Sequence, residues 1–453
     1  MTSDLLAVIL AAGQGTRMKS ALPKVLHRVA GKAMVDHVID AARAAGATRI
    51  AVIAGHGLEQ VQAHFAGREV ELVKQEPQLG SGHALQQALP LLEQTGGDVL
   101  VLNGDAPLVD PASLQVLAAE HRDARMQVSF LAATVDDPRR LGRIVRRDGR
   151  VRIVEWADAT DEQRGIREVN AGIYCFDAIW LTKQLPSLTL SKKGEYYLTE
   201  LVERAEKVRV VQAGSLASCV GVDTRQALAE AERIMQDRLR ARWMDEGVTF
   251  IDPGSVFLDA DSRIGRDTIF YPNVVVSRST IGEGSVIGPG SRLDGAQVGA
   301  RCSVRESVLE SAVLEDEVEV GPFSHLRPGA YVESGAKLGN YVEIKNARVG
   351  RGTQIHHFSY TGDAEVGQRV NIGAGTITCN YNSETGEKSR TIIGDDASTG
   401  SDTLLVAPVT LGAGAMTGSG AVVTRDVAAD SLVVGVPARE IRKVRKGARD
   451  HAG

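Results

Sequence analysis

LAAGQGTRMKSALPK, residues 10–24, is the stretch that decides the fold of the first half of this 453-residue chain. It overlaps an apolar run over residues 5–12, LLAVILAA, whose length is typical of a buried β-strand. Gly13 and Gly15 then allow a tight turn whose backbone N–H groups can approach phosphate oxygens. A dinucleotide-binding fingerprint requires a third glycine, but Met18 occupies that position. The stretch therefore indicates a phosphate-binding turn after a strand and disfavours a dinucleotide fold.

Two cations complete this phosphate-binding stretch. Arg17 and Lys24 follow the glycines, and both side chains can donate hydrogen bonds to a polyphosphate. We therefore take them as candidate catalytic residues.

The overall composition excludes several classes of protein. A net charge of −5 argues against a nucleic-acid-binding protein. The first apolar run is short and lacks a basic segment before it, and no run reaches the length of a membrane span. The four cysteines are scattered without a C-x-x-C pair, which is typical of a protein from a reducing compartment. We therefore expect a cytoplasmic protein that binds neither nucleic acid nor membrane.

The first half of the chain alternates between strand and helix patterns. This alternation is typical of an α/β domain with a mainly parallel, Rossmann-like sheet, whose ligands gather at the carboxyl ends of the strands. We assign residues 1–226 to this domain. The expected strands are 5–12, 50–54, 70–73, 98–102 and 127–132, and the expected helices are 33–45 and 81–94.

A long amphipathic helix is expected next. Leu228, Ala231, Met235 and Leu239 recur at helical spacing, and the pattern ends at a glycine, Gly247. We assign residues 227–248 to a helical linker between two unlike domains.

The second half has a six-residue period. The period predicts a left-handed parallel β-helix over residues 249–453, with the aliphatic side chains stacked inside. The polar insertion 379–390, CNYNSETGEKSR, should project as a loop, and the basic end from Arg439 is expected to be flexible. Aliphatic residues followed by glycine stand at Ile264, Ile281, Ile287, Val298, Val320, Leu338, Val349, Val366, Ile372, Ile393 and Leu411.

Several strings together resemble one family, the bifunctional bacterial N-acetylglucosamine-1-phosphate uridyltransferase / glucosamine-1-phosphate N-acetyltransferases. The resemblance implies that the second domain transfers acetyl from acetyl-CoA to glucosamine-1-phosphate. The first domain would then join the product, N-acetylglucosamine-1-phosphate, to UTP and release pyrophosphate. The final product is UDP-N-acetylglucosamine, a precursor of peptidoglycan and lipopolysaccharide. The strings are LAAGQGTRM, LPKVLH, QLGSGHA, NGDAPL, GEYYLTE, RPGA and NIGAGTITCNY.

The resemblance also implies a set of nucleotide- and sugar-binding residues. Gly80 and Ser81 open a helix, where backbone N–H groups favour polar or anionic ligands. Asn170 is a polar residue inside an otherwise apolar strand. The full set implied for UTP or the UDP-sugar is Leu10, Ala11, Ala12, Gly13, Lys24, Gln75, Gly80, Ser81, Asn103, Gly104, Asp105, Gly142, Glu155, Asn170 and Asp223.

A magnesium site is expected at Asp105 and Asp223. Asp105 follows the strand 98–102, and Mg²⁺ prefers carboxylate oxygens. The family usually has asparagine where this chain reads Gly221-Val222-Asp223. Asp223 also matches the N-cap of a helix with Gln226 as its capping-box partner, so it can be a metal ligand, a cap, or both.

For acetyl transfer, the resemblance selects His357 of the pair His356-His357 as the general base, because a neutral imidazole titrates near the working pH. The family forms trimers with shared acetyltransferase sites, so a homotrimer is expected. The implied sugar-binding residues are Arg327, Lys345, Tyr360 and Asn371. The implied acetyl-CoA-binding residues are Ala374, Asn380, Tyr381, Ser401, Ser419 and Arg439.

Two other functions are compatible with parts of the sequence. A single-function sugar-1-phosphate nucleotidyltransferase would use the β-helix only for assembly. It would not need His357, Tyr360, Asn380 and Tyr381. A non-catalytic scaffold would need neither Lys24 nor Asp105. The bifunctional enzyme therefore accounts for more of the sequence than either alternative.

Overall fold

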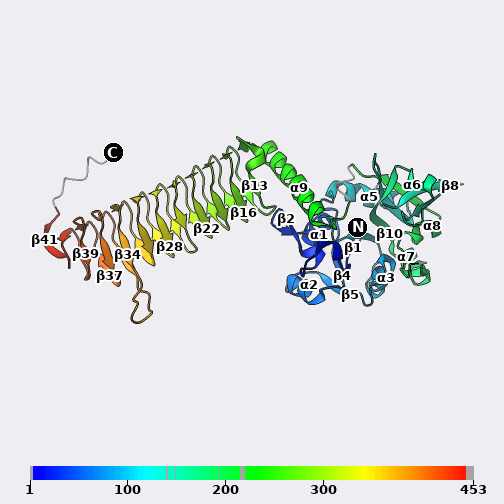
Figure 1. Cartoon of the computed structure of the whole chain (residues 1–453), viewed down its shortest axis with the longest axis horizontal. Helices are drawn as coiled ribbons and strands as arrows, with labels where there is room; N and C mark the ends of the chain where they lie inside the picture. Colours follow the sequence, from blue (N-terminus) through cyan, green and yellow to red (C-terminus); the bar gives the residue numbers. More distant parts are fainter. Residues whose placement is uncertain (1–3, 139–140, 148, 192, 215–219, 445–453) are drawn as a thin grey trace. The chain divides into compact units, whose positions relative to one another are not determined.

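The computed structural model describes residues 4–138, 141–147, 149–191, 193–214 and 220–444 (Figure 1). The chain divides into two compact units, Met1–Met235 and Gln236–Gly453, and the dividing point falls inside the long helix α9 (Arg225–Asp245). None of the helices in the described ranges combines the length and the apolar character that crossing a bilayer requires.

The first unit is built on one mixed sheet with the strand order β11-β7-β10-β6-β1-β4-β5. Neighbours in this order run parallel except for β10, which is antiparallel to both β6 and β7, while β8 and β9 form an antiparallel ribbon beside β10. The predicted mainly parallel α/β domain is therefore confirmed. The strands are β1 (Leu5–Ala11), β4 (Arg49–Ala54), β5 (Glu71–Lys74), β6 (Asp98–Asn103), β7 (Val128–Thr134), β8 (Arg143–Arg147), β9 (Arg150–Val154), β10 (Glu168–Asp177) and β11 (Val208–Gln212).

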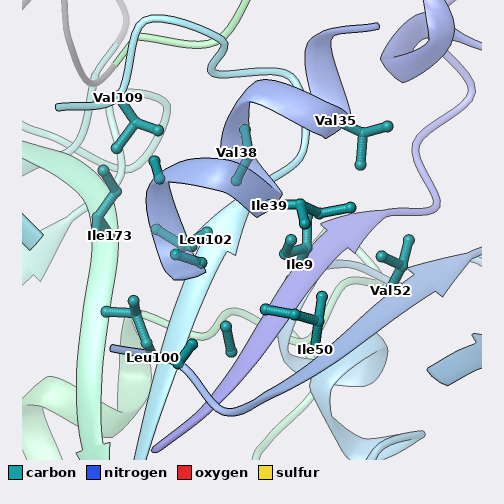
Figure 2. Close-up of a cluster of buried hydrophobic side chains, with 14 of the residues drawn as sticks. Ile9, Val35, Val38, Ile39, Ile50, Val52, Leu100, Leu102, Val109 and Ile173 are labelled. Carbon is teal, nitrogen blue, oxygen red and sulfur yellow. The ribbon is translucent and has the colours of Figure 1, made fainter. Parts of the chain in front are cut away.

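Both faces of this sheet are covered, which explains why β1 reads as a continuous apolar run. Alternate residues of a strand point to opposite faces. Ile9 joins the cluster with Val38, Ile39 and Leu102 that Figure 2 shows between α1 (Met34–Ala44) and the sheet. Val8 belongs to the cluster on the opposite face.

The helices cover the sheet as the alternating pattern predicts, with one difference. The expected helix 81–94 is two short helices, α3 (Ser81–Gln86) and α4 (Leu89–Leu92). Pro90 stands in the first turn of α4, and it has no N–H with which to continue α3. The other helices are α2 (Leu58–Phe65), α5 (Pro111–Asp123), α6 (Asp161–Arg164), α7 (Ala178–Gln184) and α8 (Glu200–Arg204); short β2 (Arg28–Val29) and β3 (Lys32–Ala33) form a hairpin.

Helix α9 contributes to both units. Its first half packs with Ala231 into a small cluster that contains Leu108 and Val222 of the first unit. In its second half, the buried Gln236 side chain exchanges hydrogen bonds of 2.7 and 2.9 Å with the backbone of Leu258. The helix ends before Gly247, which has a φ of 90°.

The second unit is a left-handed parallel β-helix, as predicted. Within the described residues its strands stack into three long parallel sheets, here called the first, second and third faces (Figure 1). From β12 to β35 the chain visits the faces in that order on each coil. The first face is β12 (Thr249–Phe250), β15 (Ile269–Phe270), β18 (Val286–Ile287), β21 (Ser303–Val304), β24 (Glu319–Val320), β27 (Lys337–Asn340), β30 (Gln354–His357) and β33 (Asn371–Ile372).

The second face is β13 (Phe257–Leu258), β16 (Val275–Ser277), β19 (Arg292–Asp294), β22 (Val308–Glu310), β25 (His325–Leu326), β28 (Glu343–Lys345), β31 (Tyr360–Gly362), β34 (Ile377–Cys379), β36 (Leu404–Val406) and β39 (Val422–Val423). The third face is β14 (Arg263–Ile264), β17 (Thr280–Ile281), β20 (Gln297–Val298), β23 (Val313–Leu314), β26 (Tyr331–Val332), β29 (Arg348–Val349), β32 (Ala364–Val366), β35 (Thr391–Ile393) and β37 (Val409–Leu411).

The aliphatic residue of each repeat points inward, as the period predicts. On the first face the buried Ile287, Val304, Val320 and Leu338 follow one another on successive coils. Each strand therefore buries one side chain per coil, and the stack forms a continuous core.

The end of the β-helix corrects one expectation. The residues from Arg439 were expected to be flexible, but β41 (Arg439–Lys443) pairs antiparallel with β40 (Ser431–Val434), which lies beside β38 (Met416–Thr417). The strand pairs because its backbone completes the last exposed edge. The remaining residues of that basic end, 445–453, lie outside the described residues. The predicted loop 379–390 is confirmed in part: Cys379 ends β34, and the chain projects from the coil after that strand (Figure 1).

Candidate active sites

A cavity of about 490 Å³ opens at the carboxyl ends of β1 and β6. The two strands lie side by side, and Gly104 donates its N–H to the Leu10 carbonyl at 2.9 Å. This edge is where ligands of parallel sheets bind. The lining residues are Leu10, Ala11, Ala12, Gly13, Gln14, Lys24, Val25, Gln75, Gln78, Gly80, Ser81, Ala84, Asn103, Asp105 and Glu195.

The two glycines of the opening stretch have different roles. Gly15 has a φ of 62°, and a Cβ on it would lie 2.8 Å from Lys24 Cβ, so a side chain there would displace the lysine. Gly13 has open space where a Cβ would be, within the cavity lining. Gly15 therefore fits Lys24 closely, whereas Gly13 leaves room for a ligand.

Lys24 connects the two aspartates predicted to bind a metal. Its ammonium contacts Asp105 and lies 2.9 Å from Asp223 Oδ1. Burial alone would lower the pKa of Lys24, but Asp105 and then Asp223 outweigh burial and raise that pKa. Arg17, whose side chain is exposed, reaches the second oxygen of Asp223 at 2.8 Å. The predicted cations and carboxylates therefore form one charged network at the cavity.

Asp105 and Asp223 fit a divalent metal of the magnesium type. No three acidic, histidine or cysteine side chains in the described ranges gather into a complete metal cage. However, Mg²⁺ is commonly held by one or two carboxylates together with substrate phosphates. The two carboxylates converge on the same ammonium, so they also converge on a position where a cation is stable.

The segment before α9 packs closely against Asp105. Val222 donates its N–H to the Asp105 carbonyl at 2.8 Å, and a Cβ on Gly221 would lie 2.8–2.9 Å from the Asp105 carboxylate. The cap of α9 is Thr224, whose hydroxyl accepts the N–H of Ala227 at 3.1 Å. Of the roles left open for Asp223, the structure contradicts the helix cap: Thr224 caps α9, and the Asp223 carboxylate contacts Arg17 and Lys24.

Gln75 is buried beside the cavity. Its Nε2 donates to the Gly80 carbonyl at 3.0 Å and contacts His83 Nδ1 at 3.1 Å. Gly80 caps α3 with a φ of 97°, and a Cβ there would meet the Tyr196 carbonyl at 2.8 Å. The amide is therefore held in one orientation.

Three further residues of the set implied for UTP or the UDP-sugar, Gly142, Glu155 and Asn170, lie close together, and Asn170 belongs to β10. A Cβ on Gly142 would be 3.6 Å from Asn170 Cβ and 3.8 Å from Glu155 Oε2. Burial raises the pKa of the Glu155 carboxyl, which accepts a hydrogen bond from Thr199 at 3.2 Å. Glu155 also lines a second cavity of about 540 Å³.

Asn170 has a local structural role as well. Its Nδ2 donates to the Tyr174 hydroxyl at 2.6 Å, and its Oδ1 accepts the Gly172 N–H at 3.0 Å. The register of β10 against β7 shifts between Asn170 and Tyr174. The polar residue therefore supports a bulge in the strand, and Gly172 also accepts from Asn103 Nδ2 at 3.3 Å.

In the β-helix, several predicted residues stack at the corner between the first and second faces, here called the first corner. Gly375 donates to the His357 carbonyl, Asp402 to the Ala374 carbonyl, and Gly420 to the Ser401 carbonyl. These bonds place His357, Ala374, Ser401 and Ser419 in one column on successive coils. The column also contains Asn340, which lies opposite His357 in the pairing of β27 with β30.

The corner between the second and third faces, here called the second corner, gathers positive charge. Lys388 of the loop, and then Arg327, lower the pKa of Lys345. Arg327 pairs with Glu343 at 2.8 Å. Such a concentration of cations, of which Arg327 and Lys345 are half-buried, is suited to an anionic group such as a phosphate.

Asn380 and Tyr360 lie at the same second corner. The Asn380 Nδ2 contacts Asp363 and is 3.5 Å from the Tyr360 hydroxyl. Burial would raise the pKa of Asp363, but hydrogen bonds from Asn346 and Asn380 outweigh it and lower that pKa. Asn380 is thus buried in its own coil, and the projecting part of the loop begins at Tyr381, which is 59% exposed.

Two predicted residues lie apart from these groups. Asn371 is exposed on the first face, opposite Gln354. Arg439 begins β41, and its guanidinium donates to the Ala438 carbonyl at 2.9 Å.

Sequence reasoning did not select Gly221, Asn340, Asp363 and Lys388. It also did not select five residues that line the first cavity, Gln14, Val25, Gln78, Ala84 and Glu195. Gly221 is two residues before the predicted metal ligand Asp223, and Asp363 is three residues after the predicted sugar ligand Tyr360, so both are close in sequence to predicted residues. Asn340 and Lys388 do not belong to any recognisable motif. Asn340 is brought beside His357 by the register of the coils, and Lys388 is brought beside Lys345 by the loop.

The first unit is a nucleotidyltransferase domain. A model of the MobA-like NTP transferase domain matches residues 7–172, which include the predicted phosphate-binding turn, Lys24 and Asp105. Enzymes of this class generally use a divalent metal.

Relatives that align with almost the whole chain show the family to which both units belong. A Bifunctional protein GlmU from Synechococcus sp. (strain CC9605) is 44% identical over 97% of this chain and 98% of its own. Those from Heliobacterium modesticaldum and Geobacillus thermodenitrificans are 45% and 44% identical, over 94% and 96% of both chains. The chain belongs to the GlmU family, so the predicted family and its two transferase activities, uridyl and acetyl transfer, are confirmed.

Proposed function

We propose that the first unit joins UTP to N-acetylglucosamine-1-phosphate, and that the second unit first makes that sugar from glucosamine-1-phosphate and acetyl-CoA. The product, UDP-N-acetylglucosamine, would supply peptidoglycan and lipopolysaccharide synthesis. The observation that carries the proposal is the network of Lys24, Asp105 and Asp223 at the edge of a cavity lined by the phosphate-binding turn. We place both reactions in the cytoplasm, where UTP and acetyl-CoA are found.

Uridyl transfer needs positioning and charge rather than a protein nucleophile. A phosphate oxygen of the sugar attacks the α-phosphorus of UTP, the bond to the bridging oxygen breaks, and pyrophosphate leaves. Lys24 and Arg17 neutralise the phosphates, and the turn at Gly13 donates backbone N–H groups. Asp105 and Asp223 would hold Mg²⁺, which supplies further charge neutralisation at the phosphates.

The base specificity is assigned to Gln75. Both hydrogens of its Nε2 are directed to the Gly80 carbonyl and His83 Nδ1, so its Oε1 is the atom that would accept the N3–H of uracil. Because its Nε2 is already held by Gly80 and His83, the amide is presented in a fixed orientation. Gly142, Glu155 and Asn170 would contact the sugar.

Acetyl transfer needs the sugar amine in its unprotonated form. His357 accepts the proton of the ammonium, the amine nitrogen attacks the thioester carbonyl, and the carbon–sulfur bond breaks to release CoA, which takes up a proton. Ala374, Ser401 and Ser419 continue the His357 column and would bind acetyl-CoA along it. Arg327 and Lys345 would bind the sugar phosphate, with Tyr360 and Asn371 on the sugar.

The separation of the two corners supports a site shared between chains. His357 is six residues before Asp363, so roughly 15–20 Å of extended chain lie between the corners. One sugar phosphate does not span that length. We therefore assign each acetyltransferase site to the first corner of one copy and the second corner of another, with Tyr381 reaching across. Such a contact between unlike surfaces closes into a ring, here a homotrimer.

A coupled assay tests the two activities separately. With glucosamine-1-phosphate, acetyl-CoA, UTP and Mg²⁺ present, both free CoA and pyrophosphate should appear, and pyrophosphate should require prior acetylation. Pyrophosphate release from supplied N-acetylglucosamine-1-phosphate without any CoA release would instead support the single-function nucleotidyltransferase.

A further inference from the structure

The proposed base His357 is held by a side chain with no assigned role. His357 Nδ1 lies 2.7 Å from Asn340 Oδ1. The two residues are 17 apart in the sequence, which is one coil of the β-helix, and they stand opposite each other in the pairing of β27 with β30. The contact is therefore a property of the coil register and not of one local turn.

The backbone around this contact is fixed. Phe358 donates its N–H to the Asn340 carbonyl at 3.1 Å, and the rings of Tyr341 and Phe358 stack with their centroids 5.0 Å apart. A Cβ on Gly339 would meet the His356 carbonyl at 2.0 Å, so glycine is required for this close approach. The Asn340 amide and the imidazole consequently face each other without rearrangement.

The contact defines the protonation state of the imidazole nitrogens. An amide oxygen can only accept a hydrogen bond, so Nδ1 of His357 must carry the hydrogen. The lone pair of a neutral imidazole is then on Nε2, the nitrogen that can take a proton from an amine. In the opposite tautomer, Nδ1 and Oδ1 would both be acceptors at 2.7 Å.

We propose that Asn340 is a positioning residue for acetyl transfer, which orients His357 and keeps its Nε2 unprotonated and available as the base. The proposal rests on the proposed role of His357. The neighbouring His356 offers an internal comparison, because its Nε2 contacts Gln354 Oε1 at 3.2 Å. In His356 the nitrogen that a catalytic base would use, Nε2, is therefore already engaged by Gln354.

The test compares variants of the full chain in steady-state acetyl transfer. Asn340→Leu keeps the size of the side chain but removes the acceptor. It should lower kcat by about 10- to 100-fold while both KM values stay within about twofold. Asn340→Asp keeps an acceptor and should stay within about fivefold of the unmodified enzyme. Gln354→Leu, which removes the partner of His356, should have no effect beyond about twofold.

Three results would overturn the proposal. These are an Asn340→Leu enzyme with unchanged kcat, a loss confined to KM, or an Asn340→Asp enzyme as impaired as Asn340→Leu. Thermal unfolding of the second unit identifies a misfolded variant, and Asn340→Ala then replaces Asn340→Leu. His357→Ala is measured in parallel: retained acetyl transfer would refute the base itself, whereas its loss with normal Asn340→Leu activity would refute only the positioning role.

Discussion

Lys24 Nζ lies 2.9 Å from Asp223 Oδ1, although the two residues are 199 positions apart in the sequence. The same ammonium contacts Asp105 at the end of β6. The lysine thus connects the predicted phosphate-binding turn with a central strand and with the segment before α9. Each of these three segments supplies one charge, so the network forms only when all three are in place.

Removing this lysine should separate the two activities. Lys24→Ala leaves the two carboxylates without their shared cation and removes a phosphate contact, so uridyl transfer should fall by about 100-fold or more. Acetyl transfer should stay within about twofold, because its residues lie in the other compact unit. Lys19→Ala, on an exposed lysine of the same segment, is the control. Loss of both activities in a folded protein would contradict the assignment of two independent sites.

The two aspartates should differ in their tolerance of asparagine. Asp223→Asn keeps an oxygen ligand and matches the residue usual in the family, so uridyl transfer should fall by less than about tenfold. Asp105→Asn should cause a loss of about 100-fold or more, because Asp105 contacts Lys24 from the cavity lining. Titration with Mn²⁺ in the presence of UTP measures metal affinity directly. Equal and mild effects of both changes would argue against a metal held by this pair.

A methyl group on Gly221 should disturb the same site indirectly. A Cβ there would lie within 3.0 Å of the Asp105 carboxylate, closer than real contacts allow. We expect Gly221→Ala to lower uridyl transfer by about tenfold by displacing that carboxylate. Gly96→Ala, where a Cβ meets no atom within 4 Å, is the matched control. An unchanged Mn²⁺ affinity in Gly221→Ala would show that the position of the Asp105 carboxylate does not depend on a glycine at residue 221.

Local patterns predicted the elements better than the contacts between them. The strand, the turn with Gly15 and the β-helix period depend on neighbouring residues, and the sequence was sufficient for these. The capping pattern at Asp223 left open whether this residue is a metal ligand, a cap or both. In the structure its carboxylate contacts Lys24, and Thr224 caps α9. The Asn340 contact depends on a 17-residue coil, which a six-residue period does not define.

The stability of the first unit should depend on the ionisation of Glu155. Burial raises its pKa in the folded state, so the folded protein binds this proton more tightly than the unfolded chain does. The stabilising contribution is complete below the unfolded pKa, near 4.5, and is lost as pH rises through the folded pKa. Glu155→Gln should therefore raise the unfolding temperature at pH 7, with a smaller gain at pH 4. A gain independent of pH would contradict this explanation.

The arrangement of the corners predicts that the acetyltransferase sites are shared. His357 belongs to the first corner and Asn380 to the second, and each change, His357→Ala or Asn380→Ala, should inactivate acetyl transfer in a uniform assembly. When the two inactive proteins are mixed under conditions that exchange subunits, some sites should receive an intact His357 from one chain and an intact Asn380 from another. Acetyl transfer should then recover in part, while uridyl transfer stays constant throughout.

The expected size of this recovery follows from the ring. In a trimer with random exchange of equal amounts, each site combines a first corner and a second corner from adjacent chains, so about one site in four should be intact. A mixture of His357→Ala with His357→Ala, Asn340→Leu chains is the control and should show no recovery, because both chains carry the same defective corner. Exchange itself is verified by fluorescence transfer between labelled chains. If labelled chains exchange and acetyl transfer still fails to return, His357 and Asn380 must act within one chain. The sugar would then have to bind near the first corner, and Arg327 and Lys345 at the second corner could not hold its phosphate.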